Sequence, residues 1–144
     1  MEFVFTDGGR KEAGYKGFTG DCCARAFAIA TGRPYKEVYD DINDIAQKER
    51  PRKHKKSNAR TGVYVETAHK LAKKYGMEWV PTMGIGTGCR VHVRKDELPC
   101  GALVLNLSRH FACVKDGVLY DTHDCSRGGT RCVYGYWRFP SDDS

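Results

Sequence analysis

The pattern of apolar residues changes from helical to strand-like about halfway along the chain. In the first half, apolar positions recur with a period of about 3.6 residues in CARAFAIATG, YKEVYDDINDIAQ and TGVYVETAHKLAKKYG. Gly32 and Gly76 are stop signals for the first and third of these segments, and Pro34 suits the first position of the second. The sequence therefore predicts helices here, with Cys22 at the start of the first.

In the second half, short β-prone runs are separated by turn signals such as Asp116-Gly117. These runs are MEWVPTM, RVHV, ALVLNL, HFACV, VLYDT and RCVYGYWRF. Helices followed by a meandering antiparallel sheet are typical of an α+β fold rather than of alternating βαβ units. A chain of 144 residues has the size of one domain, so we expect a single domain over residues 1–144.

Composition and the N-terminal sequence predict the compartment. The chain is 40% hydrophobic and 29% charged, and no run approaches the ~18 apolar residues of a membrane span. The first residues lack a basic region followed by an apolar run, so we expect a cytoplasmic protein without a membrane partner. The cysteines number seven, which is odd, and we expect reduced thiols. A disulfide between Cys125 and Cys132 is geometrically possible but disfavoured in that compartment.

One segment carries a concentrated positive charge. The sequence KERPRKHKKSNAR begins at Lys48 and ends at Arg60, and it contains seven Lys and Arg residues against one Glu. The net charge of the whole chain is +6. We expect an exposed loop here, for which simple solvation is one interpretation and contact with nucleic acid or an acidic protein is the other.

Cys22 is the candidate nucleophile. It follows the polar Gly20-Asp21 entry and lies in the first turn of the predicted helix, where the positive end of the helix dipole favours a thiolate. Cys23 instead shares the apolar face of Phe27. The alternative is that both cysteines are small buried packing residues.

A cysteine nucleophile needs a histidine as its base, and the chain contains five. We expect His54 and His69 to be solvated, because one lies in the basic segment and the other on a Lys-rich helix. His92 could face either side of a strand. His110 opens HFACV directly after the apolar strand ALVLNL, and it is the candidate base, with a structural role as the alternative.

A hairpin argument selects the third residue of the site. If Asp116-Gly117 forms a two-residue turn, Lys115 pairs with Val118 across it. Asp121 then projects on the same face as the candidate base and within reach of its ring. One extra residue in the loop would invert the faces, so Asp124 is the reserve candidate.

This order of residues resembles the papain-like cysteine peptidase superfamily, in which the nucleophile heads the N-terminal helix and the His and Asn or Asp come later from the sheet. The segments GDCCARAFAIATG and RHFACVKDGVLYDTHDCSRGGTRCVYGYW resemble small, largely uncharacterised papain-like proteins of bacteria and phages, from Thr19 to Trp137. At motif level they also resemble peptidase domains that process bacteriocin leaders. The resemblance implies Cys22 as nucleophile, His110 as general base and acid, and Asp121 as the orienting group.

The chain departs from this superfamily at one position. Papain-like enzymes usually place a Gln shortly before the nucleophile, where it helps to form the oxyanion hole. Here that position is Lys16, and no Gln occurs between Met1 and Cys22. We therefore expect the oxyanion hole to use the backbone N–H of Cys22 with a donor from Lys16 or Thr19.

Two further patterns suggest other chemistry. Several Cys and His residues lie close enough in sequence to suggest zinc, but they include no C-x-x-C pair, so we expect no metal. They are Cys89, His92, Cys100, Cys125 and Cys132. The segment GIGTG at 84–88 lacks the Lys-Ser/Thr and the helix of a phosphate-binding loop, so we expect no cofactor and interpret it as a loop that lines the cleft or moves as a lid.

Two functions fit these observations. The first is a cysteine-nucleophile hydrolase with a peptide or protein substrate, a peptidase or isopeptidase. Transfer to an amine, as in transglutaminase-like or acyltransferase enzymes, would use the same triad. The second is a catalytically silent papain-like domain that binds a protein or nucleic acid through its basic segment, which the missing Gln favours.

Overall fold

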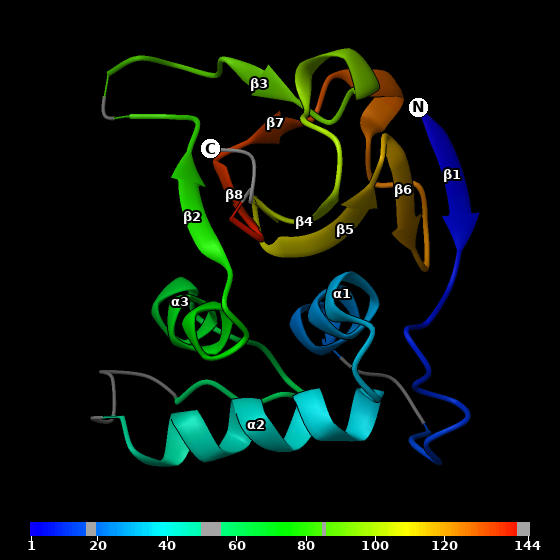
Figure 1. The fold of residues 1–144 in the computed structure, drawn as a ribbon, viewed down its shortest axis with the longest axis vertical. Coiled ribbons are helices and arrows are strands. Elements are labelled where there is room, and N and C mark those ends of the chain that lie inside the picture. The colour runs from blue at the N-terminus through cyan, green and yellow to red at the C-terminus, as the bar shows by residue number, and fades with distance from the viewer. Residues whose placement is uncertain (17–19, 50–55, 85, 141–144) are drawn as a thin grey trace.

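The protein is an α+β structure in which helices cover one side of a curved, mostly antiparallel sheet (Figure 1). The computed structural model describes residues 1–16, 20–49, 56–84 and 86–140. The helices are α1 (Cys22–Thr31), α2 (Tyr35–Gln47) and α3 (Val65–Lys74). The main sheet has the order β1-β6-β5-β4-β8-β2. Its strands are β1 (Glu2–Phe5), β2 (Glu78–Pro81), β4 (Ala102–Leu107), β5 (His110–Lys115), β6 (Val118–Asp121) and β8 (Gly135–Arg138).

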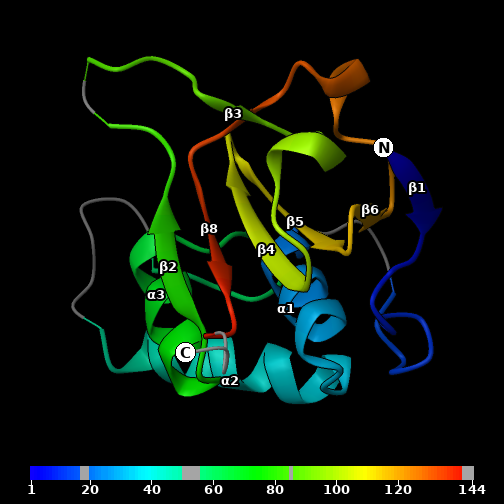
Figure 2. The same ribbon diagram turned by 45° about the horizontal axis from the view of Figure 1, so that its top comes forward.

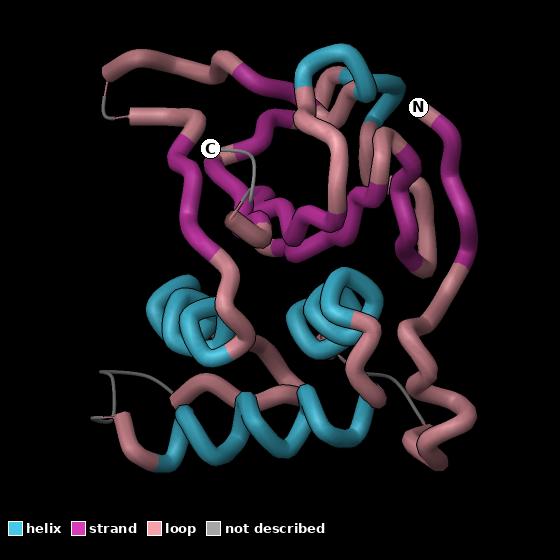
Figure 3. The backbone as a smooth tube through the Cα atoms, viewed as in Figure 1, coloured by secondary structure: helices cyan, strands magenta, loops and turns pink. Residues whose placement is uncertain are grey.

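Helices α1 and α3 pack against the sheet, and α2 crosses beneath them (Figures 1 and 3). The face of α1 predicted from the sequence is buried, with Cys23 and Phe27 both inside the core that α1 shares with β4, β5 and β8. Gly32 follows α1 in the left-handed conformation, with φ 72°, and donates its N–H to the carbonyl of Ala28. The helix predictions are therefore confirmed, and α1 holds Cys22 at its N-terminus.

The opposite face of the sheet curls around a second, two-stranded sheet, β3 (Val91–His92) with β7 (Cys132–Val133) (Figure 2). Short 3₁₀ helices, η1 (Lys95–Glu97) and η2 (Arg127–Gly129), lie beside it. Because β4 is covered on both faces, Val104 packs on the helix side while its neighbours Leu103 and Leu105 pack on the other. A strand buried on both faces explains the continuous apolar run ALVLNL.

Strand β1 was not predicted. It pairs in parallel with β6, where Phe3 lies opposite Leu119, and Phe3 packs against the second core. The lead-in sequence carries no turn signal that ties it to a neighbour, because a parallel partner lies far along the chain. In the described residues, the other neighbouring strands of the main sheet pair in antiparallel orientation.

The end of the basic segment is not the exposed loop that we expected. Residues 50–55, including His54, lie outside the described residues, but Ser57 and Ala59 are buried. The Ser57 hydroxyl is 2.6 Å from that of Thr67, and the N–H of Ala59 donates to the side chain of Asn43. Polar side chains thus tie this part of the segment to α2 and α3. None of the helices in the described part of the chain has the length and apolar character that crossing a membrane requires.

The prediction for His69 was wrong, because this ring is not simply solvated. Its Nδ1 accepts a hydrogen bond from Nε1 of Trp137 at 3.0 Å, and the ring stands edge-on to Trp79. Burial lowers the pKa of His69, which keeps the ring neutral and able to accept. The Lys-rich pattern of α3 describes only its outer face, whereas His69 lies on the flank that contacts β2 and β8.

Gly135 is the point where the sheet accommodates the ring of Trp79. A Cβ at this position would collide with the six-membered ring of Trp79. We expect Gly135→Ala to lower the free energy of unfolding by about 1–3 kcal/mol, because the ring must move out of the core. Gly84→Ala is the matched control, since its Cβ would meet nothing closer than 3.6 Å. Urea denaturation measures both; equal midpoints would contradict this prediction.

Candidate active site

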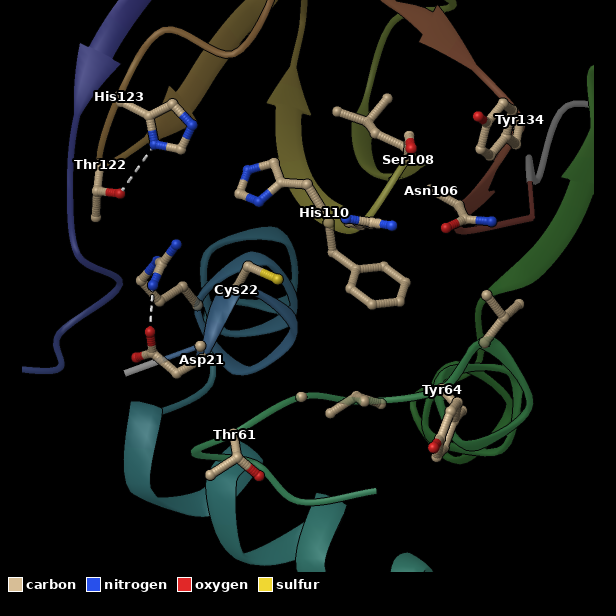
Figure 4. A pocket seen from close by; sticks show the side chains of 18 residues that line it. Asp21, Cys22, Thr61, Tyr64, Asn106, Ser108, His110, Thr122, His123 and Tyr134 are labelled. Carbon is tan, nitrogen blue, oxygen red and sulfur yellow. Dashed lines mark hydrogen bonds and ion pairs between the residues drawn. The ribbon is translucent and has the colours of Figure 1, made fainter. Parts of the chain in front are cut away.

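A cleft of about 820 Å³ opens between the N-terminus of α1, the segment 61–65 and the ends of β4 and β5 (Figure 4). Cys22 and His110 lie at its centre, with Thr122 and His123 on one side. Tyr64 and Tyr134 lie on the other side, and the lining also includes the apolar side chains of Val63, Val65, Leu107 and Phe111. A cleft with a mostly apolar wall and a few convergent polar groups is typical of ligand sites.

The two adjacent cysteines have different environments. Cys22 is the first residue of α1, is partly exposed and lines the cleft, whereas Cys23 is buried in the helix-side core. Burial raises the pKa of the Cys23 thiol well above its ordinary value, and the neighbouring Cys22 adds to this shift. Cys23 is therefore a packing residue, and Cys22 is the thiol that a substrate can reach.

The structure brings His110 and Asp121 together. Nε2 of His110 lies 2.6 Å from Oδ2 of Asp121. The predicted hairpin register is confirmed, because Lys115 pairs with Val118 across a turn in which Asp116 and Gly117 both have positive φ.

Asp124 makes a different contact. It is exposed and accepts hydrogen bonds from the hydroxyl and the backbone N–H of Ser126, at 2.6 and 3.0 Å. These bonds lower the pKa of Asp124, the side-chain bond most strongly. Of the two candidates for the third residue, Asp121 is thus the one that orients the imidazole.

The electrostatics of the pair favour charge on both partners. Burial lowers the pKa of His110, but hydrogen bonds to Asp121, Cys125 and Cys22 outweigh it and raise the pKa to about 11. Burial would raise the pKa of Asp121, and the bond to His110 overcomes it, so this pKa lies below its ordinary value. An imidazolium held by a buried carboxylate and facing the Cys22 thiol is the arrangement that stabilises a thiolate.

A buried ionic network behind the nucleophile was not foreseen from the sequence. Asp21, the residue before Cys22, is fully buried, and it forms an ion pair with Arg25 and accepts a 2.6 Å hydrogen bond from the Tyr35 hydroxyl. The guanidinium of Arg25 also lies 3.7 Å from Oδ1 of Asp121. Arg25 therefore connects the start of α1 to the carboxylate of Asp121. The spacing of Asp21 and Arg25 along a helix is the sequence signal that could have revealed the first pair.

Cys125 is a second thiol beside the base. It is buried, it contributes to the raised pKa of His110, and the ligand atoms of Cys125, His110 and Asp121 all lie within 4.8 Å of one another. A metal ion held by these three atoms would have to replace the bond between His110 and Asp121. The arrangement is therefore better suited to acid–base chemistry than to metal binding.

The donors predicted for the oxyanion hole stay untested. Thr19 lies outside the described residues, and Lys16 is seen to accept a hydrogen bond through its carbonyl, from Arg60 at 2.9 Å. As the first residue of α1, Cys22 has a backbone N–H without an intrahelical partner. Asn106 was missed by sequence reasoning; it lines the cleft on the Tyr134 side, where its amide is available to a ligand (Figure 4).

The described residues of the Gly-rich segment, 84 and 86–88, do not line the candidate active site. Gly84, Gly86 and Gly88 surround a neighbouring hollow with Met83 and Tyr134, and Tyr134 belongs to both hollows. The segment therefore adjoins the cleft through one aromatic side chain.

The expectation of reduced cysteines is wrong for two of the seven. Cys89 and Cys132 form a disulfide with a Cα–Cα distance of 5.8 Å, whereas Cys125 is free. Sequence spacing could not reveal this pair, because the pairing of β3 with β7 brings Cys132 beside a loop that precedes it by 43 residues.

Comparison of the chain with protein-family models, with curated proteins and with solved structures gives no match. The class of protein is therefore described from its own fold and side chains. It is an α+β protein with a Cys and a His side chain at the centre of a cleft and a buried Asp bonded to the His.

Proposed function

We propose that this protein is a papain-like cysteine hydrolase that cleaves a peptide or isopeptide bond through Cys22, His110 and Asp121. The observation that carries the proposal is the position of His110, whose ring is bonded to Asp121 and lines the same cleft as the Cys22 thiol at the head of α1. A nucleophile, a base and a group that orients the base are the components of this chemistry. Cys22 and His110 line one open cleft, and Asp121 is buried behind the His110 ring.

Each residue has a defined step in the reaction. The Cys22 thiolate attacks the substrate carbonyl carbon, and the backbone N–H of Cys22 donates to the oxyanion that forms. The His110 imidazolium then gives its proton to the leaving amine, and the acyl group remains on sulfur. Water attacks this thioester while His110 takes a proton from it, which releases the acid and restores the thiolate. Asp121 keeps the imidazole oriented throughout.

The lining of the cleft indicates the kind of substrate. Tyr64 and Tyr134 form an aromatic wall on one side of Cys22, with the Asn106 amide on the same side, and Phe111 also lines the cleft. Such a wall suits an extended peptide segment with an apolar side chain close to the scissile bond, whose backbone bonds to the amide. A cytoplasmic peptide or protein substrate remains the prediction.

The test is iodoacetamide labelling of the native protein across pH 5–9 with peptide mapping. We expect Cys22 to react at pH 6 roughly tenfold or more faster than an ordinary thiol, because the ion pair with His110 supplies thiolate at that pH. Cys100 is an internal reference, since it is free and exposed. His110→Ala should remove the advantage, whereas His123→Ala, which changes a ring 5.2 Å from that of His110, should leave it.

The labelling result also separates the competing functions. If Cys22 reacts no faster than Cys100 and ignores His110→Ala, the enzyme proposal fails and the silent binding domain replaces it. If Cys22 is activated, a peptide thioester offered with and without hydroxylamine distinguishes the outcomes. Release of acid alone supports a hydrolase, and preferential formation of hydroxamate supports an acyltransferase.

A further inference from the structure

A second cluster of soft donor atoms lies outside the cleft, where β3 meets β7. His92 on β3 is directly opposite Cys132 on β7, and Cys89 precedes β3 by a single intervening residue. Nε2 of His92 lies 3.6 Å from Sγ of Cys89, which is joined to Cys132 in the disulfide. Two sulfur atoms and an imidazole nitrogen therefore converge on one point at the surface.

The ring of His92 is held in one orientation by a carboxylate. Its Nδ1 lies 3.1 Å from Oε1 of Glu97, and the same oxygen accepts from the backbone N–H of His92 at 3.2 Å. Arg94 in turn lies 3.4 Å from the other oxygen of Glu97. A carboxylate on one ring nitrogen, with the other nitrogen turned towards a cysteine sulfur, is the outer-shell arrangement of histidines that bind zinc.

The separation of the Cys89 sulfur and the His92 nitrogen agrees with tetrahedral coordination, and the two sulfur atoms move apart when the disulfide is reduced. Zinc bonds of ~2.3 Å to sulfur and ~2.05 Å to nitrogen place two ligand atoms about 3.6 Å apart at the tetrahedral angle. The observed separation of Cys89 Sγ and His92 Nε2, 3.6 Å, matches this value. The thioether of Met83 lies 3.9 Å from Sγ of Cys132, so further soft sulfur surrounds the position. Cys89 is exposed, which leaves an entry path and room for its sulfur to move away from Cys132.

We propose that Cys89, Cys132 and His92 form a zinc site when their disulfide is reduced. An external dithiol transfers two electrons and two protons to the disulfide and becomes a disulfide itself, leaving two thiols on the protein. Binding of Zn²⁺ then releases both thiol protons, and the two thiolates neutralise the charge of the ion. His92 supplies the third ligand through Nε2, and water occupies the fourth position. The cytoplasm predicted from the sequence is a compartment in which the dithiol form would prevail.

The disulfide and the zinc-bound form crosslink the same two segments, those that contain Cys89 and Cys132. The Thr82 hydroxyl donates a hydrogen bond to the carbonyl of Val133 on β7, at 2.7 Å. The Thr82 N–H donates to the carbonyl of Tyr134, the residue after β7, at 3.2 Å. The disulfide or the metal closes the loop that begins there, next to the Tyr134 wall of the cleft. The site therefore exchanges one crosslink for another without requiring the cleft to rearrange.

The test uses the full chain carrying Cys22→Ser, so that the cleft thiol cannot bind the probe. Protein reduced with a phosphine, with the reductant then removed, is titrated with Co²⁺ as a spectroscopic substitute for zinc. We expect thiolate-to-cobalt charge-transfer absorption that saturates at one ion per chain and disappears when Zn²⁺ is added. Protein that was never reduced should show none.

Variants locate the site. Cys132→Ser should abolish the charge-transfer absorption, His92→Ala should weaken binding at least a hundredfold, and Glu97→Gln should weaken it about tenfold to a hundredfold. Cys100→Ser should leave binding unchanged, because that thiol lies elsewhere on the surface beside Arg138 and Phe139. Absence of the band, its survival in Cys132→Ser, or its loss in Cys125→Ser would each overturn the proposal. Circular dichroism of each variant establishes that the protein is folded.

Discussion

Replacing Arg25 with methionine is expected to lower the free energy of unfolding by about 3–5 kcal/mol. Asp21 is fully buried, and its partners include the guanidinium of Arg25, which is itself largely buried. Loss of Arg25 leaves part of a buried negative charge uncompensated, which costs more than the ion pair itself contributes. Arg25 also lies 3.7 Å from Asp121, so that carboxylate loses a neighbouring cation as well. Chemical denaturation monitored by fluorescence of the buried Trp137 measures the change.

Lys36→Met is the matched control for Arg25→Met. Lys36 and Asp40 have the same i,i+4 spacing as Asp21 and Arg25, but both side chains are exposed. We expect no measurable change in stability, because solvent screens such a pair. Adding Asp21→Asn to Arg25→Met should restore part of the loss, since the buried charge disappears and the amide can still bond to Tyr35. Equal losses for the single Lys36 and Arg25 variants would show that burial of Asp21 does not govern the effect.

The contribution of the His110–Asp121 pair to stability is expected to decline as the pH rises above 6.5. The folded protein raises the pKa of His110 from 6.5 to about 11. This contribution is therefore complete below pH 6.5 and is lost as the pH rises towards 11. The pKa of Asp121 is lowered from 3.8, so its contribution is present above that pH and is lost on acidification. Together the two groups contribute most between about pH 4 and 6.5.

Urea unfolding of wild type and His110→Gln at intervals from pH 6 to 8.5 tests this pH dependence. The difference in unfolding free energy between the two proteins should fall by up to about 1.4 kcal/mol per pH unit. Taking the difference cancels the other titrating groups, among them His69. His123→Gln should follow the wild-type curve, because His123 is exposed. A constant difference between wild type and His110→Gln would mean that His110 does not hold an additional proton in the folded state.

Several features of this protein follow from the sequence because they depend on neighbours along the chain. Periodicity predicted α1 with Cys22 at its head, since a helix is formed by contacts between residues three and four apart. The Asp116-Gly117 turn predicted the pairing of β5 with β6, because a two-residue turn leaves only one register. That register places Asp121 on the face of His110, and the two side chains meet as expected. The catalytic role of this constellation remains a prediction.

Other features depend on segments that are distant in sequence, and only the tertiary structure decided them. The parallel pairing of β1 with β6, the contact of Arg25 with Asp121 and the approach of Cys125 to His110 each join parts of the chain that no turn connects. The same holds for the Cys89–Cys132 bond, which the β3–β7 pairing creates. Local patterns record which face of an element is buried, but not which distant side chains will be buried beside it. Arg25 and Cys125, which approach Asp121 and His110 from elsewhere in the chain, are consequently among the residues that the sequence could not identify, whereas Asp121 itself follows from a local turn.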